Sequence, residues 1–155
     1  MLLIAFIGTI QHEVSKEAVR ELVRQIKAES TTDCIIVCNA DGLFLTSSKL
    51  NEQLETLFDS GIDLICVGEQ AISRNCCRTV FKKAEWPIIK AINLPGSSFV
   101  TSAKLFEQNN ERLNIISTSG QKGKISVDYS YTILDEYFRN KKDSSTVIII
   151  ESNSF

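Results

Sequence analysis

Residues 63–73 read DLICVGEQAIS. Leu64 to Val67 form an unbroken apolar run, which is typical of a strand buried on both faces of a parallel sheet. Gly68 ends this run, and Glu69 and Gln70 follow it directly. Open α/β sheets usually place their binding sites at the carboxyl ends of their strands. The stretch therefore predicts a buried strand and a candidate site at its carboxyl end.

Strand-like and helix-like segments alternate on both sides of this stretch. Apolar runs predict strands at 2–8, 33–39, 62–68, 87–93 and 145–151, and 3.6-residue periodicity predicts helices at 15–29, 48–61, 71–84 and 128–142. Residues 97–108 and 111–119 predict a β-hairpin that turns at Asn109–Asn110. We therefore expect one α/β domain over residues 1–155, with a mainly parallel sheet flanked by helices and one β-hairpin. Four consecutive β-branched residues, 147–150, predict a last strand buried on both faces.

The composition argues against several classes of protein. A net charge of −2 gives no basic surface for nucleic acid or for an anionic membrane. The opening MLLIAFIG is too short to span a bilayer and lacks a basic flank, so a first core strand is the better interpretation. The five cysteines are odd in number and show no CxxC spacing. These features favour a cytoplasmic protein without a cysteine-based metal site.

The residues that follow each predicted strand are the candidates for a functional site. Because the carboxyl ends of parallel strands meet at one edge of the sheet, we expect Asp41, Glu69 and Glu151 to lie close together. The full set of candidate positions is Thr9, Asn39, Asp41, Gly42, Glu69, Gln70, Glu151 and Asn153.

Several segments of the chain, in the same order, resemble the YmdB-type metallophosphoesterases, a calcineurin-like phosphodiesterase family. These segments are FIGTI, VCNADG, SGIDLICVGEQ, IIKAINLP and VIIIESN, and the resemblance stays in register over essentially the whole chain. It implies a calcineurin-like sandwich fold. It also implies a site where Asp, Glu, Asn and His hold two cations, which activate a water molecule and stabilise the transferring phosphate.

Position by position, this chain departs from the ligands that the resemblance implies. Thr9 stands where the family has its first Asp, and Asp41 and Gly42 stand where it has Glu and Asn. Glu69 and Gln70 replace an Asn-His pair, and Asn153 replaces a later His. The family's closing segment, with two further His ligands, has no counterpart before Phe155, so we expect a C-terminally truncated sandwich. His12 is the single histidine, and it lies where the family usually has glycine.

These departures predict a pseudoenzyme without a metal cofactor. We expect it to serve as a structural or protein-binding module, with a second copy or a protein partner covering an exposed sheet edge or face. One alternative is a residual phosphodiesterase or phosphatase that holds a single Mg²⁺ or Mn²⁺ through Asp41, Glu69 and Glu151. Another is a non-catalytic phosphate-ligand binder that uses the amides after Gly8 or the lysines of residues 118–124. The sequence leaves these alternatives open.

Overall fold

The computed structural model of the protein describes residues 2–30, 32–46, 49–73, 79–81, 86–94, 100–108, 110–119 and 130–152. Strands and helices alternate through most of the chain, as the hydrophobic pattern predicts. In chain order they are β1 (Leu3–Thr9), α1 (Lys16–Glu29), β2 (Cys34–Asn39), α2 (Leu43–Thr46), α3 (Leu50–Asp59), β3 (Leu64–Val67), α4 (Glu69–Ser73), β4 (Ile88–Lys90), β5 (Ala103–Gln108), β6 (Glu111–Ser119), α6 (Ser130–Asn140) and β7 (Thr146–Ser152).

The strands form two sheets. The first sheet has the order β1-β2-β3-β4, and each neighbouring pair in it is parallel. The second sheet has the order β5-β6-β7, with β5 antiparallel and β7 parallel to β6. Asn110, the second residue of the predicted turn, has a φ of 63°, a left-handed conformation that asparagine tolerates better than most residues. The α/β class, the mainly parallel pairing and the β-hairpin are thus confirmed.

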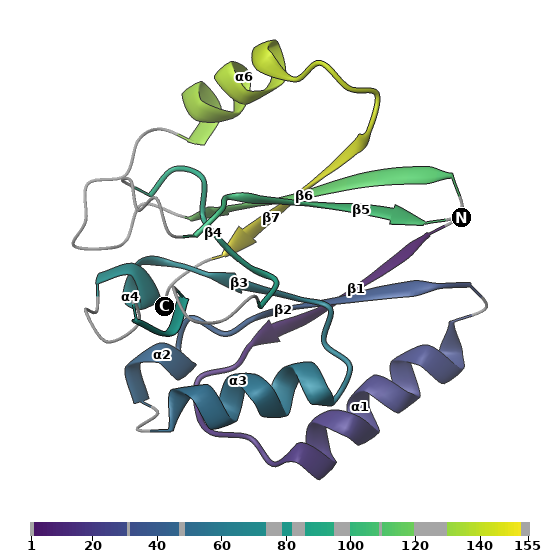
Figure 1. Ribbon diagram of the computed structural model, residues 1–155, viewed down its shortest axis with the longest axis vertical. Helices are drawn as coiled ribbons and strands as arrows, with labels where there is room; N and C mark the ends of the chain where they lie inside the picture. The colour runs from purple at the N-terminus through teal and green to yellow at the C-terminus, as the bar shows by residue number, and fades with distance from the viewer. Residues whose placement is uncertain are drawn as a thin grey trace.

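The two sheets and their helices stack in four layers (Figure 1). Helices α1 and α3 cover one face of the first sheet, and the second sheet lies against its other face. Helix α6 lies on the far side of the second sheet, where the Asn114 amide of β6 donates a hydrogen bond to the Tyr137 hydroxyl. The arrangement places helices on both outer faces of a two-sheet sandwich.

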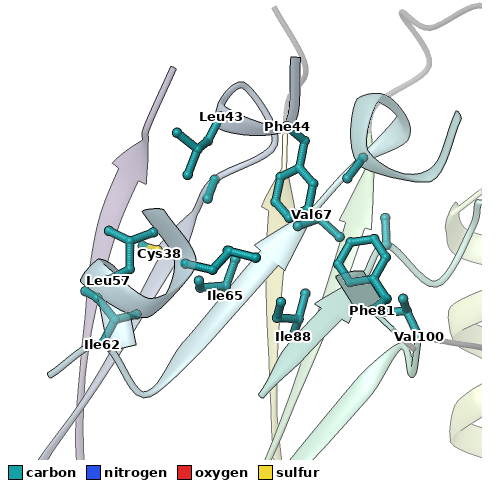
Figure 2. Packing of buried hydrophobic residues seen from close by; sticks show 14 of the residues in the cluster. Cys38, Leu43, Phe44, Leu57, Ile62, Ile65, Val67, Phe81, Ile88 and Val100 are labelled. Carbon is teal, nitrogen blue, oxygen red and sulfur yellow. The ribbon is translucent and has the colours of Figure 1, made fainter. Parts of the chain in front are cut away.

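Strand alternation divides the apolar core into two clusters. Ile36 and Cys38 of β2 point toward the helices, whereas Ile35 and Val37 point into the space between the sheets. Figure 2 shows residues of the first cluster, which extends from Ile62 and Ile88 at the amino ends of the strands to Val67 at the end of β3. Within it, Phe44 stacks on Phe81 with ring centroids 5.3 Å apart. Each such fully buried side chain contributes about 1.5–3 kcal/mol, so this layer fixes where the strand ends lie.

The last strand corrects one expectation. The side chain of Ile149 is 45% exposed, although the β-branched run predicts a strand buried on both faces. The reason is topological, because β6 is the one described strand beside β7, and α6 leaves part of the outer face of the second sheet uncovered. Among the described residues, no helix is long and apolar enough to cross a membrane.

Candidate functional site

Asp41 lies at the carboxyl end of β2 and makes the central contacts of the candidate site. Its backbone N–H donates to Asn39 Oδ1 at 3.0 Å, which sets the turn that follows the strand. Its Oδ1 accepts the N–H groups of Gly68 at 2.9 Å and Ala71 at 3.0 Å. Its Oδ2 accepts the Gln70 N–H at a longer 3.4 Å. The carboxylate therefore holds the first turn of α4, which begins at Glu69, two residues earlier than the sequence predicts.

Burial decides the protonation behaviour of this carboxylate. Asp41 is only 4% exposed, and loss of hydration raises the pKa of its carboxyl group. The three backbone hydrogen bonds oppose that rise because they stabilise the ionised form. The neighbouring Glu69 carboxylate adds to the rise by charge repulsion. A cation bound here would have to compete with the helix amides for the same oxygen atoms.

Gly42 shows that the loop after β1 closes over the loop after β2. A Cβ atom at position 42 would stand 2.7 Å from the Cα of Gln11 and 3.1 Å from the carbonyl oxygen of Ile10. The two loops are joined by the Ile10 N–H, which donates to the Asn39 carbonyl at 2.8 Å. Backbone thus occupies the space that a side chain at position 42 would need, and an asparagine there would not fit without movement.

Gly68 has an equally close neighbour. A Cβ atom at position 68 would lie 2.8 Å from Asp41 Oδ2, so only glycine lets the end of β3 come this near to the carboxylate. The turns that follow β2 and β3 are therefore held together by contacts between the Asp41 carboxylate and the Gly68 backbone.

Of the other predicted site residues, Asn39 and Gln70 hydrogen-bond to Asp41, whereas Thr9 and Glu69 lie near it. Thr9 is exposed at the end of β1, across a register irregularity from Asn39. Glu69 is half-buried on the first turn of α4, and the buried Gln70 Oε1 has no hydrogen-bond partner among the described residues. His12 is exposed.

The third acid of the sequence-predicted trio lies only partly within the described structure. The backbone of Glu151 pairs with Thr118 in the second sheet, whereas its side chain and the whole of Asn153 lie outside the described residues. No group of three His, Cys, Asp or Glu side chains that could hold a metal ion occurs among the residues described.

Sequence reasoning missed two buried polar residues near this edge. Lys90 of β4 is 6% exposed, pairs in register with Val67, and donates from Nζ to the Leu94 carbonyl at 2.8 Å. Burial lowers the pKa of its ammonium group. Asn93 both donates to the carbonyl of Ser119 at 2.7 Å and accepts its N–H at 2.8 Å, which ties the two sheets together. The signal for Lys90 was a lone charge inside the apolar run IIKAI.

Two cavities lie away from Asp41. One, of about 400 Å³, lies beside α6 and is lined by residues that include Ile92, Tyr137 and Lys141. The other, of about 430 Å³, lies at the opposite end of the first sheet, where Asp33 and Asp63 belong to its lining. Of the predicted site residues whose side chains the structure describes, none lines either cavity.

Comparison with known proteins matches most of the chain to one family. A family model described as "YmdB-like protein" matches residues 5–154. The search of curated proteins gave no match. Several solved structures share the fold at identities too low to transfer an activity.

Three of these structures illustrate the likeness. A hypothetical protein from Thermus thermophilus has a TM-score of 0.76 at 17% identity, covering 98% of this chain and 58% of its own. A phosphatase from Mycoplasma pneumoniae has a TM-score of 0.77 at 16% identity, with coverages of 98% and 55%. A putative 5′-nucleotidase from Staphylococcus aureus, solved in complex with alpha-ketoglutarate, has a TM-score of 0.70 at 10% identity, with coverages of 99% and 38%. This chain thus spans little more than half the length of the first two.

Proposed function

The chain belongs to the YmdB-like protein family, and we propose that it is a non-catalytic member that serves as a structural or protein-binding module. One observation carries the proposal. Asp41, the acid that the resemblance places among the metal ligands, is buried and accepts three backbone N–H groups at the start of α4. A carboxylate in that role is a helix cap, and withdrawing it toward a cation would leave buried N–H groups unpaired.

The surroundings of Asp41 support the same conclusion. The contact between Gly42 and the Ile10–Gln11 backbone fills the place of a further ligand side chain. Phosphoryl transfer on a two-metal site also needs imidazole and carboxylate ligands around an open space for the phosphate. The single histidine of the chain, His12, is exposed on the neighbouring loop.

A binding role is supported by large apolar side chains that remain exposed. Among the residues that the structure describes, six are between 38% and 46% exposed, namely Leu3, Phe6, Leu22, Leu105, Phe138 and Ile149. Apolar side chains on open strands and on a loosely covered sheet face are normally buried by another chain. We therefore propose self-association or a protein partner, and no cofactor.

A residual single-cation phosphodiesterase is the second candidate. Asp41 and Glu69 end neighbouring strands and interact electrostatically, which is the charge arrangement that attracts a hard cation such as Mg²⁺ or Mn²⁺. Glu151 would be the third ligand. This reaction would need Asp41 to give up the α4 amides.

Metal content and hydrolysis, measured on the same protein, separate the two candidates. The protein is incubated with Mn²⁺ or Mg²⁺, desalted, analysed for bound metal, and assayed on a chromogenic phosphodiester. We expect no stoichiometric metal and no hydrolysis above that of the Glu69→Gln variant, which removes one charge while keeping the side-chain shape. One ion per chain together with hydrolysis that this variant abolishes would overturn the proposal and establish the enzyme.

A further inference from the structure

Strand β1 is an open sheet edge without charged side chains. Strands β1, β5 and β7 end the two sheets. The other end strand, β4, is bonded from Lys90 N to the carbonyl of Thr101, which precedes β5, and the next segment is bonded from Ile92 N to the Ser117 carbonyl of β6. Of the three end strands, β5 contains Lys104 and Glu107, and β7 contains Glu151. Charges on an edge strand oppose pairing with another strand. The sequence of β1, LIAFIGT, has none.

Both faces of β1 carry a large apolar side chain that the rest of the described chain leaves exposed. Leu3 is 40% exposed on the face that packs toward the helices, with Ala5 and Ile7. Phe6 is 46% exposed on the opposite face, where Leu2 and Ile4 reach the cluster between the sheets. A neighbouring strand would have to be apolar on both faces to cover them.

The backbone of β1 is also open on its outer side. The Leu3 N–H donates inward to the Asp33 carbonyl of the β2 side at 3.0 Å. Because peptide groups alternate in direction along a strand, the N–H and C=O groups of Ile4 and Phe6 point away from β2. Figure 1 shows β1 at the margin of the first sheet, with no described strand beyond it.

We propose that β1 pairs with the β1 strand of a second copy of this chain, antiparallel and about a two-fold axis. The required neighbour is an uncharged strand, apolar on both faces, and within the described chain β1 is the edge strand that fits this description. A two-fold axis makes two identical edge strands run antiparallel. We place the axis at Phe6, the central residue of Leu3–Thr9, so that Phe6 lies beside Phe6 of the second copy and Leu3 lies opposite Thr9. The first sheet then continues across the dimer. This inference rests on the proposed binding role and names its surface and partner.

The first test is the mass of the protein in solution. Light scattering across a concentration series should give twice the chain mass of 17.3 kDa at high concentration. Phe6→Glu should leave a monomer, because the dimer would place two carboxylates side by side. Phe138→Glu is the matched control, since Phe138 is a phenylalanine of the same 46% exposure on α6. We expect this control to remain a dimer, with circular dichroism showing that both variants are folded.

Hydrogen exchange provides a second readout that needs no substitution. The amides of Ile4 and Phe6 should exchange at least about tenfold more slowly in the dimer than in the diluted monomer. A monomer at every concentration with rapidly exchanging amides overturns the proposal. So does a monomer in which these amides are protected, because the chain itself would then cover the edge. A dimer that Phe138→Glu breaks and Phe6→Glu preserves also overturns it. A monomer that fails to hydrolyse phosphodiesters would refute the dimer alone and leave the loss of catalysis unaffected.

Discussion

Replacing Asp41 by alanine tests the central structural role assigned to this residue. In the native protein its carboxylate accepts the Gly68 and Ala71 N–H groups at 2.9 and 3.0 Å, in a site where Asp41 is 4% exposed. Alanine would leave both N–H groups buried and unpaired, and the longer 3.4 Å bond from Gln70 would be lost as well. The first turn of α4 and the end of β3 would lose their mutual anchor.

The magnitude follows from these contacts. Each buried N–H group left without an acceptor costs about 1–3 kcal/mol, so the two short bonds together set a loss of about 2–6 kcal/mol. Relief of the buried charge offsets part of this at neutral pH, because burial raises the pKa of the Asp41 carboxyl. We therefore expect Asp41→Ala to lower the free energy of unfolding by about 2–4 kcal/mol.

Urea unfolding followed by circular dichroism measures this loss. Asp59→Ala is the matched control, because Asp59 is a surface acid that forms an exposed 2.7 Å ion pair with Lys16, and its removal should have a much smaller effect. We expect equal unfolding curves for the wild type with and without Mn²⁺. An Asp41→Ala variant as stable as Asp59→Ala, or a wild type that Mn²⁺ stabilises and Asp41→Ala does not, would refute the helix-cap role.

Three further experiments address the same region. Gly42→Ala should destabilise the protein by about 1–3 kcal/mol through overpacking against Gln11. The control Gly8→Ala should change stability little, since nothing lies within 4 Å of its added Cβ. Equal midpoints of the two variants in thermal melts would contradict this prediction. The wild type should lose stability relative to Asp41→Asn as the pH rises above 3.8, because the raised pKa means that the folded state holds the Asp41 proton more tightly than the unfolded state does. A difference in the free energy of unfolding that does not change with pH would contradict this prediction. The lowered pKa of Lys90 has the opposite effect on stability, so the wild type should gain stability relative to Lys90→Met as the pH approaches 10.5. Urea unfolding at pH 8 and above measures this gain. If Lys90 were hydrated, the difference in the free energy of unfolding between the two proteins would stay constant.

The alternation of apolar runs with helical periodicity determined the secondary structure and the parallel pairing. Buried strands need continuous apolar residues, and Leu64 to Val67 are fully buried in β3 as the stretch DLICVG predicts. Ser15 caps α1 by accepting the Ala18 N–H, and Gly61 follows α3 with a φ of 100°. These are local interactions, in which the residues that decide the geometry are close neighbours in sequence.

The tertiary structure alone decided what the candidate residues do. Asp41 and Gly68 are 27 positions apart in sequence, and their hydrogen bond depends on how β2 and β3 pack side by side. The burial of Lys90 and the exposure of Ile149 likewise depend on which strands become sheet edges. Sequence patterns identify a carboxylate at the end of a strand, but a distant backbone amide can bind the same oxygen atoms that a cation would use. That competition is settled only when the chain is folded.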